Sequence, residues 1–324
     1  MSFSSDVKEE LSRLEDHEKH CRIAELSAII RLCGKVHTET SGRGSILLHT
    51  ENVAVARRFY LLIKSSFDIQ PDVAVQRHEY LRKNRFYIIS LRGREVIAVL
   101  KATGIVNNLG QINEEDFIPE YGLLQNTCCR RAFLRGAFLA AGSMTDPEKN
   151  YHFEMVCPHL EQAAGIRDLC RYFGLEAKIV IRKRYYVVYM KEGSAISDVL
   201  NVMEAHKSMM RFENIRILKD VRNKVNRRVN CEAANINKTV SAAHKQIEDI
   251  RYIKNTVGLD SLPENLRDMA YARLEEPGIS LRELGTKLNR PIGKSGVNHR
   301  LRKLSEIAQN IRDNETEKTL DPLR

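Results

Sequence analysis

The sequence predicts an α+β protein in which a duplicated α-β-β-α-β-β-α unit precedes an all-α region. Two observations support this prediction. An apolar, Ala-rich segment that ends at Gly34 recurs at an offset of 108 residues, the distance from Gly34 to Gly142. Strand-like runs with period 2 and helix-like runs with period near 3.6 then follow each glycine in the same order. From about Phe212 onward, the pattern is helical alone.

The first copy opens with the segment from Arg22 to Val36, which predicts a helix closed by Gly34. A polar bend follows, and the next runs predict a strand, a second helix and two strands that form a hairpin with its turn at Lys83 and Asn84. These runs cover residues 45–49, 53–67, 72–79 and 85–91. A glycine, Gly93, leads into another helix.

The second copy repeats this order from the segment Arg130 to Met144, which predicts a helix closed by Gly142. The strand, helix and two further strands are expected at 151–156, 160–173, 177–181 and 185–190, and Gly193 leads into the last helix. Under the 108-residue offset, small residues occupy equivalent positions in the two copies: Ala24 corresponds to Ala132, and Ala28 to Gly136. Small residues four apart would let the two repeated helices approach closely.

The predicted domains follow from these patterns. Residues 1–211 would form the duplicated domain, with repeats at about 20–110 and 128–205. Residues 212–231 carry a dense run of Lys and Arg and are expected to be a basic interdomain linker. Residues 232–324 would form a helical domain, with long helices at 232–256 and 263–274. The polar residues after Asn314 are expected to fray.

Two short helices near the carboxyl end fit a helix-turn-helix. Ser280 and Glu283 have the spacing of a capping box at a helix start. Pro291 and Gly293 end that helix, and Ser295 is a candidate N-cap for the next one. The apolar stripe of the first helix consists of Leu281, Leu284 and Leu288. On the second helix, the apolar residues that recur on a single face are Val297, Leu301, Leu304 and Ala308.

The opposite face of the second helix suggests DNA binding, because no acidic residue occurs between Asn289 and Lys303. Such a face could lie in the major groove. Base readout is assigned to Ser295, Asn298, His299 and Arg302, and phosphate contact to Lys294, Arg300 and Lys303. In the upstream basic run, phosphate contact is assigned to Arg222, Lys224, Arg227 and Arg228. For the two short helices, the alternative is a plain helical hairpin with a solvated charged face. For the basic run, the alternative is a structural connection between the domains.

The composition restricts the class of protein to which this chain can belong. The 324 residues include 52 Lys and Arg against 42 Asp and Glu, a net charge of +10, which suggests a polyanionic partner without proving one. No apolar run is long enough to span a bilayer, and the amino terminus has no signal-peptide pattern, so we expect a cytoplasmic protein without membrane contact.

None of the seven cysteines is spaced as C-x-x-C, so they are expected to be buried apolar residues, with no metal site and no disulfide. His17 and His20 are interpreted as part of a solvated helix face. Glycine-loop, hydrolase and zinc-protease motifs are absent from the sequence, and no cofactor or small-molecule substrate is expected.

Three stretches together resemble the WhiA family of bacterial regulators: CCRRAFLRGAFLAAGSMTDP, RNKVNRRVNCEAANINKTV and SLRELGTKLNRPIGKSGVNHRL. The resemblance covers essentially the whole chain. It implies a LAGLIDADG homing-endonuclease-like domain followed by a helix-turn-helix. Homing endonucleases carry an acid just before the final glycine of each repeated helix, and the two carboxylates share divalent metal ions. Here those positions hold Cys33 and Ala141, which cannot supply the oxygen ligands that Mg²⁺ needs.

The resemblance therefore implies a sequence-specific transcriptional regulator without nuclease activity or catalytic residues. It also implies roles in bacterial cell division, sporulation and chromosome segregation. The implied partners are double-stranded DNA, a sigma factor and RNA polymerase, at the nucleoid. Two alternative functions remain. One is a divergent metal-dependent DNA endonuclease that uses Asp146, and the other is a protein-binding scaffold for which DNA binding is incidental. Basic residues on the predicted hairpins of both repeats leave open whether the first domain also contacts a phosphate backbone or a partner.

Overall fold

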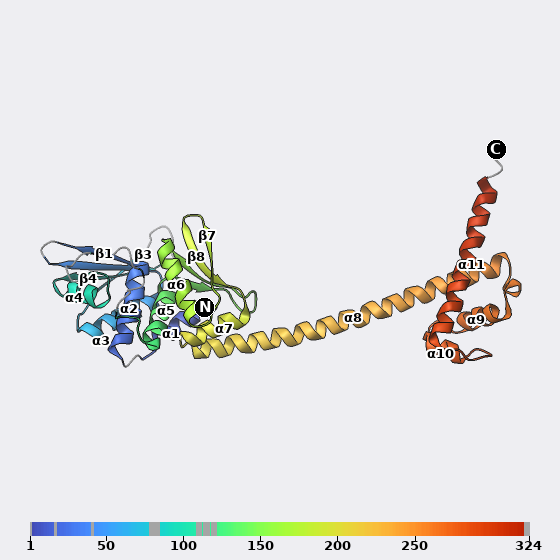
Figure 1. The fold of residues 1–324 in the computed structure, drawn as a ribbon, viewed down its shortest axis with the longest axis horizontal. Helices are drawn as coiled ribbons and strands as arrows, with labels where there is room; N and C mark the ends of the chain where they lie inside the picture. Colours follow the sequence, from blue (N-terminus) through green and yellow to red (C-terminus); the bar gives the residue numbers. More distant parts are fainter. Residues whose placement is uncertain are drawn as a thin grey trace. The chain divides into compact units, whose positions relative to one another are not determined.

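The computed structural model describes residues 2–15, 18–39, 42–77, 85–107, 112, 117 and 122–320. The chain divides into two compact units, residues 1–220 and 221–324. Figure 1 labels the helices and strands of both units. Among the described residues, no helix combines the length and the apolar content that crossing a membrane would require.

The first unit contains the predicted duplication. Each copy has the order α-β-β-α-β-β-α, which confirms the α+β fold predicted from the sequence. The first copy consists of α2 (Lys19–Cys33), β1 (Gly34–Thr38), β2 (Gly44–Thr50), α3 (Val53–Phe67), β3 (Asp72–Arg77), β4 (Arg85–Gly93) and α4 (Glu95–Ala102). The second consists of α5 (Thr127–Ala141), β5 (Gly142–Met144), β6 (Phe153–Cys157), α6 (Leu160–Tyr172), β7 (Lys178–Arg182), β8 (Tyr185–Met190) and α7 (Gly193–Val202).

Each copy forms one antiparallel sheet of four strands, ordered β1-β2-β4-β3 in the first and β5-β6-β8-β7 in the second. The alternation of apolar and polar residues explains which face is buried. Leu48 of β2 lies opposite Ile89 of β4, and both are buried in one core with Phe59 of α3. In the second sheet, Phe153 of β6 stacks on Phe138 of α5 with ring centroids 5.1 Å apart. The predicted hairpin turn at Lys83 and Asn84 lies outside the described residues.

The helices α2 and α5 pack directly on each other at the centre of this unit. A Cβ atom on Gly136 would lie 2.3 Å from the backbone oxygen of Glu25 and 3.1 Å from the Cβ of Ala28. Ala24, Ala28 and Ala132 are all buried. The small residues that correspond under the 108-residue offset therefore bring the two backbones together, as the sequence analysis predicted.

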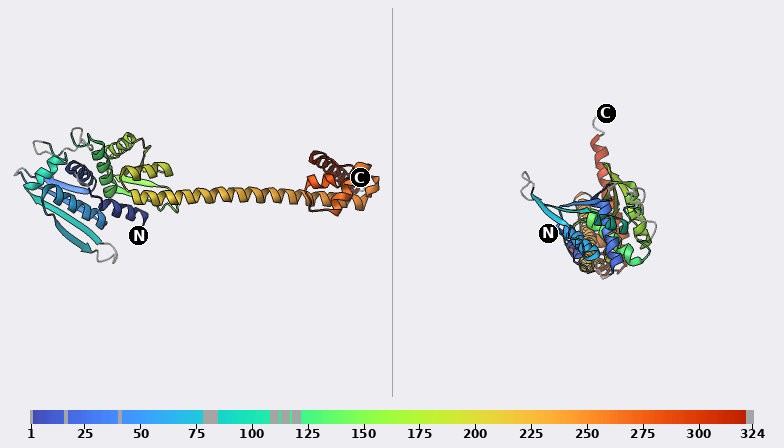
Figure 2. Two further views of the ribbon diagram at one scale, coloured as in Figure 1. Left: turned by 90° about the horizontal axis from the view of Figure 1, so that it is seen from below. Right: turned by 90° about the vertical axis from the view of Figure 1, so that its left-hand side faces the viewer.

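An amino-terminal helix that the sequence analysis did not predict, α1 (Phe3–Ser12), joins this core through Phe3, Val7 and Leu11. It also holds the start of α8 (His206–Thr256), because the Glu10 carboxylate accepts hydrogen bonds from the backbone N–H groups of Lys207 and Ser208 at 2.7 and 2.9 Å. Figure 2 shows α1 beside this end of α8. The free N–H groups of a helix start favour such a negative partner.

The second unit is helical. It contains the carboxyl-terminal part of α8, a short 3₁₀ turn (Leu259–Ser261), α9 (Glu264–Glu275), α10 (Leu281–Thr286) and α11 (Lys294–Leu320). Ile250 and Ile253 of α8 share a buried core with residues of the other three helices. The ion pair between Arg312 and Asp249, at 2.9 Å, also ties α11 to α8.

Two helix ends differ most from the sequence-based expectation. The helix expected at 232–256 begins at His206, so the basic segment 212–231 is helical. Phe212, 1% exposed, belongs to the core of the first unit. The carboxyl-terminal helix continues to Leu320 and does not end near Asn314. Long polar stretches carry little apolar periodicity, and their helix ends are therefore hard to place from sequence.

Candidate nucleic-acid interface

The interface is built on α10, the turn after it and α11. At the start of α10, the Ser280 hydroxyl accepts a hydrogen bond from the backbone N–H of Glu283 at 3.3 Å. The Glu283 carboxylate accepts one from the N–H of Ser280 at 3.0 Å. This is the predicted capping box, and its two bonds satisfy N–H groups that the helix itself leaves free. The turn then folds back so that the N–H of Ile292 donates to the oxygen of Gly285 at 3.1 Å.

The inner face of α11 is apolar, as the periodicity predicted. Leu284 and Leu288 are buried in the same core as four residues of α11, and none of these four is more than 1% exposed. They are Val297, Leu301, Leu304 and Ala308. Because these residues recur at three- and four-residue intervals, they fix which side of α11 faces solvent.

The outer face of α11 presents the predicted DNA-contacting side chains to solvent. Six of the seven are exposed: Lys294, Ser295, Asn298, His299, Arg302 and Lys303. Arg302 donates to the Glu306 carboxylate at 3.2 Å, one turn along the helix. Arg300 differs because it is half-buried and its guanidinium donates to the backbone oxygen of Asn265 in α9 at 3.3 Å.

Ser295 does not occupy the predicted capping position. The helix begins at Lys294, and the N–H of Val297 donates to the oxygen of Gly293. Ser295 therefore lies in the first turn of α11, with its side chain exposed on the outer face. The N-cap is therefore Gly293, two residues before the predicted one, and glycine is also accepted at this position.

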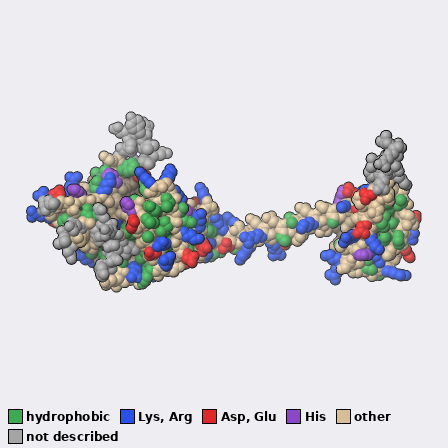
Figure 3. Space-filling view, turned by 45° about the horizontal axis from the view of Figure 1, so that its top comes forward, with side chains coloured by type: hydrophobic (Ala, Val, Ile, Leu, Met, Phe, Trp, Pro, Cys, Tyr) green, Lys and Arg blue, Asp and Glu red, His purple; other side chains and the backbone are tan. Residues whose placement is uncertain are grey.

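The basic residues of α8 are exposed as well. Arg222, Lys224, Arg227 and Arg228 lie in a stretch that is exposed at every position, and Figure 3 shows Lys and Arg side chains along α8 in blue. Arg228 pairs with Glu232 at 3.1 Å, four residues along the same helix. Exposed apolar residues such as Val225 and Val229 lie between these charges.

The family resemblance places the metal-binding acids of homing endonucleases at positions equivalent to the carboxyl ends of α2 and α5. Cys33 ends α2. Burial raises the pKa of its thiol to about 12, and the positive charge of Lys8 lowers this pKa by a smaller amount. Ala141 ends α5. Lys8 of α1 donates to the oxygen of Leu139 in α5 at 3.0 Å, and burial lowers its pKa to about 8. An ammonium group from α1 thus lies close to these helix ends.

Asp146, the acid considered for a divergent nuclease, lies in the turn after β5. Its side chain is exposed and accepts the backbone N–H of Glu148 at 2.9 Å. Of the basic hairpin residues, Arg82 and Lys83 lie outside the described residues. Lys178, Arg182, Lys183 and Arg184 are exposed, and Arg182 pairs with Glu154 at 3.2 Å.

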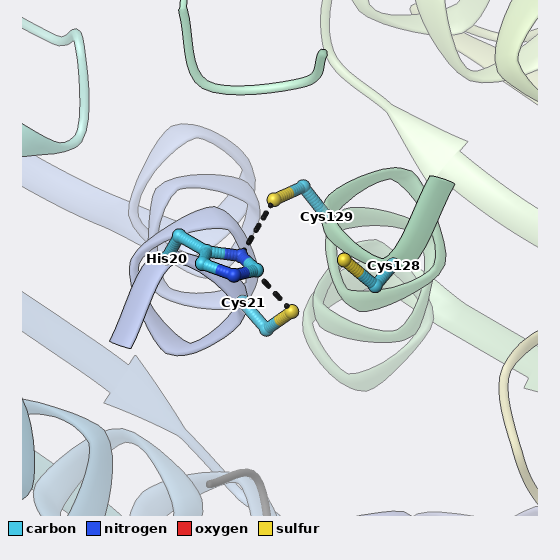
Figure 4. Close-up of side chains that lie close together, drawn as sticks. All are labelled: His20, Cys21, Cys128 and Cys129. Carbon is cyan, nitrogen blue, oxygen red and sulfur yellow. Dashed lines mark hydrogen bonds between the residues drawn. The ribbon is translucent and has the colours of Figure 1, made fainter. Parts of the chain in front are cut away.

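A cluster of sulfur and nitrogen atoms that the sequence analysis missed lies at the opposite ends of α2 and α5. It contains His20, Cys21, Cys128 and Cys129, whose ligand atoms all lie within 4.8 Å of one another (Figure 4). The 108-residue offset relates His20 to Cys128 and Cys21 to Cys129. Comparing the two repeats position by position would therefore have revealed this cluster.

Three known domain families match the chain. Residues 19–106 match the family described as WhiA N-terminal LAGLIDADG-like domain, and residues 130–222 match WhiA LAGLIDADG-like domain. Residues 225–308 match WhiA C-terminal HTH domain.

Full-length relatives and a solved structure agree with these matches. The "Probable cell division protein WhiA" of Lachnoclostridium phytofermentans is 48% identical over 312 residues, which cover 96% of this chain and 100% of the relative. The protein of the same name from Alkaliphilus oremlandii is 49% identical over 320 residues, 97% of this chain and 98% of the relative. The crystal structure of full-length DUF199/WhiA from Thermatoga maritima is similar with a TM-score of 0.59 and 27% identity, covering 96% of this chain and 99% of that one.

Proposed function

Because this chain belongs to the WhiA family, we propose that it is a sequence-specific, DNA-binding transcriptional regulator of bacterial cell division that does not cleave DNA. The observation that carries this proposal is the outer face of α11. This face is exposed and rich in basic and amide side chains, while the inner face is held in an apolar core. A helix supported in this way can enter the major groove without rearrangement of its own domain.

The side chains divide into two roles. Ser295, Asn298, His299 and Arg302 read base edges, because hydroxyl, amide, imidazole and guanidinium groups match the donor and acceptor pattern of the major groove. Lys294 and Lys303 contact phosphates and set the register of the helix. Arg300 contributes less direct contact, since its guanidinium also holds Asn265.

The basic residues of α8 give a second, sequence-independent contribution. Arg222, Lys224, Arg227 and Arg228 are exposed and contact phosphates. Each neutralised phosphate releases counterions, so the affinity for any duplex should fall steeply as salt concentration rises. A protein-binding scaffold with incidental DNA contact would show little of this dependence.

Substitution of Arg302 with alanine is expected to weaken binding to the operator by about 1–3 kcal/mol, because a bidentate contact to a base is lost. The operator is first located by footprinting the full-length protein on genomic fragments. Titrations against the operator and a random duplex then compare the parent with the variant. Arg251→Ala, which removes an exposed arginine of α8 that lies outside the helix-turn-helix, is the control. If the preference for the operator is unchanged in Arg302→Ala, Arg302 does not read a base.

Incubation of supercoiled plasmid with the protein and Mg²⁺ or Mn²⁺ is expected to give no more nicking than the same mixture with EDTA. Cys33 and Ala141 offer no carboxylate where homing endonucleases bind metal, and Lys8 brings a cation to the same helix ends. Repulsion between this ammonium and a divalent ion would further disfavour binding. Nicking that EDTA suppresses and that Asp146→Asn removes would establish the alternative, a divergent endonuclease.

We extend the proposal to partners at the promoter. A regulator of this kind acts with RNA polymerase and a sigma factor, and the first unit, which keeps its fold without paired acids, supplies a surface for such contacts. The proposed role in cell division follows the names of the relatives. Roles in sporulation and chromosome segregation, and a location at the nucleoid, are proposed from the family resemblance alone. Crosslinking of the protein to chromosomal DNA in growing cells, with recovery of sigma factor, tests this extension.

A further inference from the structure

The first turns of α2 and α5 bring together four side chains that are good ligands for a soft divalent metal. His20 and Cys21 come from α2, and Cys128 and Cys129 come from α5. In Figure 4 the imidazole of His20 lies between the sulfur atoms of Cys21 and Cys129. The geometry points to a structural zinc site of three thiolates and one imidazole that links the two repeats.

The distances fit such a site. The Nδ1 atom of His20 lies 3.1 Å from the sulfur of Cys129 and 3.3 Å from that of Cys21, and all four ligand atoms lie within 4.8 Å of one another. Tetrahedral zinc with Zn–S bonds of about 2.3 Å separates its ligand atoms by roughly 3.5–3.8 Å. Shifts of about 1 Å or less, within reach of small side-chain rotations, would bring the four atoms to these positions.

The backbone holds the ligands in place. Gly136 packs against the backbone of Glu25, so α2 and α5 cannot separate without opening the core of the unit. Each helix contributes two neighbouring ligands from equivalent positions of the two repeats. The sequence analysis expected no metal site because it looked for close pairs within one segment, whereas here the pairs meet through the internal symmetry.

The orientation of His20 supplies a second, independent observation. Its Nδ1 atom faces the thiols, while its Nε2 atom lies 3.7 Å from a carboxylate oxygen of Glu18. Metal-bound histidines usually present the second ring nitrogen to a carboxylate or a carbonyl, which fixes the tautomer and raises the basicity of the ligand. Glu18 stands where that outer partner is needed.

The helix ends also suit thiolate ligands. The amino-terminal ends of α2 and α5 both point their positive dipoles at the cluster, which favours thiolates as ligands.

Four protein ligands leave no open coordination position, so this zinc would be structural and not catalytic. It would clamp the repeats together at the ends of α2 and α5 opposite Cys33 and Ala141. Cys21 and Cys129 are buried, while Cys128 and His20 reach the surface, and the ion could therefore enter from solvent.

The test uses the full-length protein, purified without a histidine tag under reducing conditions, with metal content measured by mass spectrometry. One zinc per chain is expected. Replacement by Co²⁺ should give thiolate-to-cobalt charge-transfer bands and the visible bands of tetrahedral cobalt. Cys129→Ser is expected to weaken cobalt binding at least about 100-fold, and Glu18→Gln about 10-fold to 100-fold without changing the stoichiometry. Cys231→Ser, in an exposed position on α8, is the matched control and should bind as the parent does.

Several results would overturn the proposal. Parent protein that holds no zinc and gives no charge-transfer band on cobalt addition would do so. So would parent-like cobalt affinity in a folded Cys129→Ser protein, or loss of the signal in Cys231→Ser. Thiol titration under reducing conditions that shows a persistent disulfide within the cluster would assign these cysteines to a covalent link instead. If Cys129→Ser does not fold, the parent stoichiometry and the Glu18→Gln titration decide the matter.

Discussion

Glu25→Gln is expected to destabilise the first unit by about 3–5 kcal/mol, a large part of the roughly 5–15 kcal/mol by which a typical domain is stable. The Glu25 side chain is fully buried and receives two bonds from Arg58, at 2.6 and 2.7 Å, and one from Arg135, at 3.0 Å. Both guanidinium groups are almost completely buried. A neutral amide would remove the negative charge that these two buried guanidinium groups share, while Glu204 would still lie 2.7 Å from Arg135.

Urea unfolding followed by circular dichroism, together with hydrogen exchange of α2 and α5, measures the effect on the full chain. Glu9→Gln is the matched control, because Glu9 pairs with Arg57 at 3.0 Å near the surface and its loss should cost less than about 1 kcal/mol. Since the loss at Glu25 comes from stranded guanidinium groups, adding Arg58→Met should cost less than the two single changes together. A Glu25→Gln protein as stable as Glu9→Gln would show that the network contributes little.

The repeats of the first unit were predictable because their signal is local. The helix at 53–67 and the strand at 185–190 match α3 and β8 residue for residue, since periodicity and turn residues mark both ends. The short edge strand β5 gave no such signal, because three residues owe their conformation to pairing with β6. The helix α1 was missed although Phe3, Val7 and Leu11 recur every four residues. That spacing is compatible with a helix, but a helix of 10 residues depends on the core it packs against.

The contacts between distant segments could not be read in the same way. Glu25 interrupts the apolar helix α2, and a charge at such a position signals a local conflict, but nothing in the sequence names Arg58 and Arg135 as its partners. The cluster at His20 likewise joins residues 108 positions apart. By contrast, the outer face of α11 was predictable, because both its apolar stripe and its lack of acids lie within a single helix.

Gly285→Ala is expected to disrupt the helix-turn-helix and to abolish operator binding without touching the outer face of α11. A Cβ atom on Gly285 would lie 2.2 Å from the backbone oxygen of Ile292 and 3.0 Å from a methyl group of Val297. The backbone cannot yield easily, because the N–H of Ile292 also bonds to the oxygen of Gly285. We expect a loss of stability in the second unit of about 3 kcal/mol or more, at the upper end of overpacking effects.

Comparing Gly285→Ala with Arg302→Ala separates the loss of the fold from the loss of a base contact. Arg302→Ala should keep the fold of the second unit and lose only specificity, whereas Gly285→Ala should lose protection of α10 and α11 in hydrogen exchange together with all specific binding. Gly278→Ala, where an added Cβ meets nothing within 4 Å, is the control and should resemble the parent in both measurements. If Gly285→Ala unfolds α10 and α11 but the footprint on the operator persists, recognition must lie outside these helices. The exposed basic residues of α8 and of the first unit would then be the surfaces to examine, because they could hold DNA without the turn.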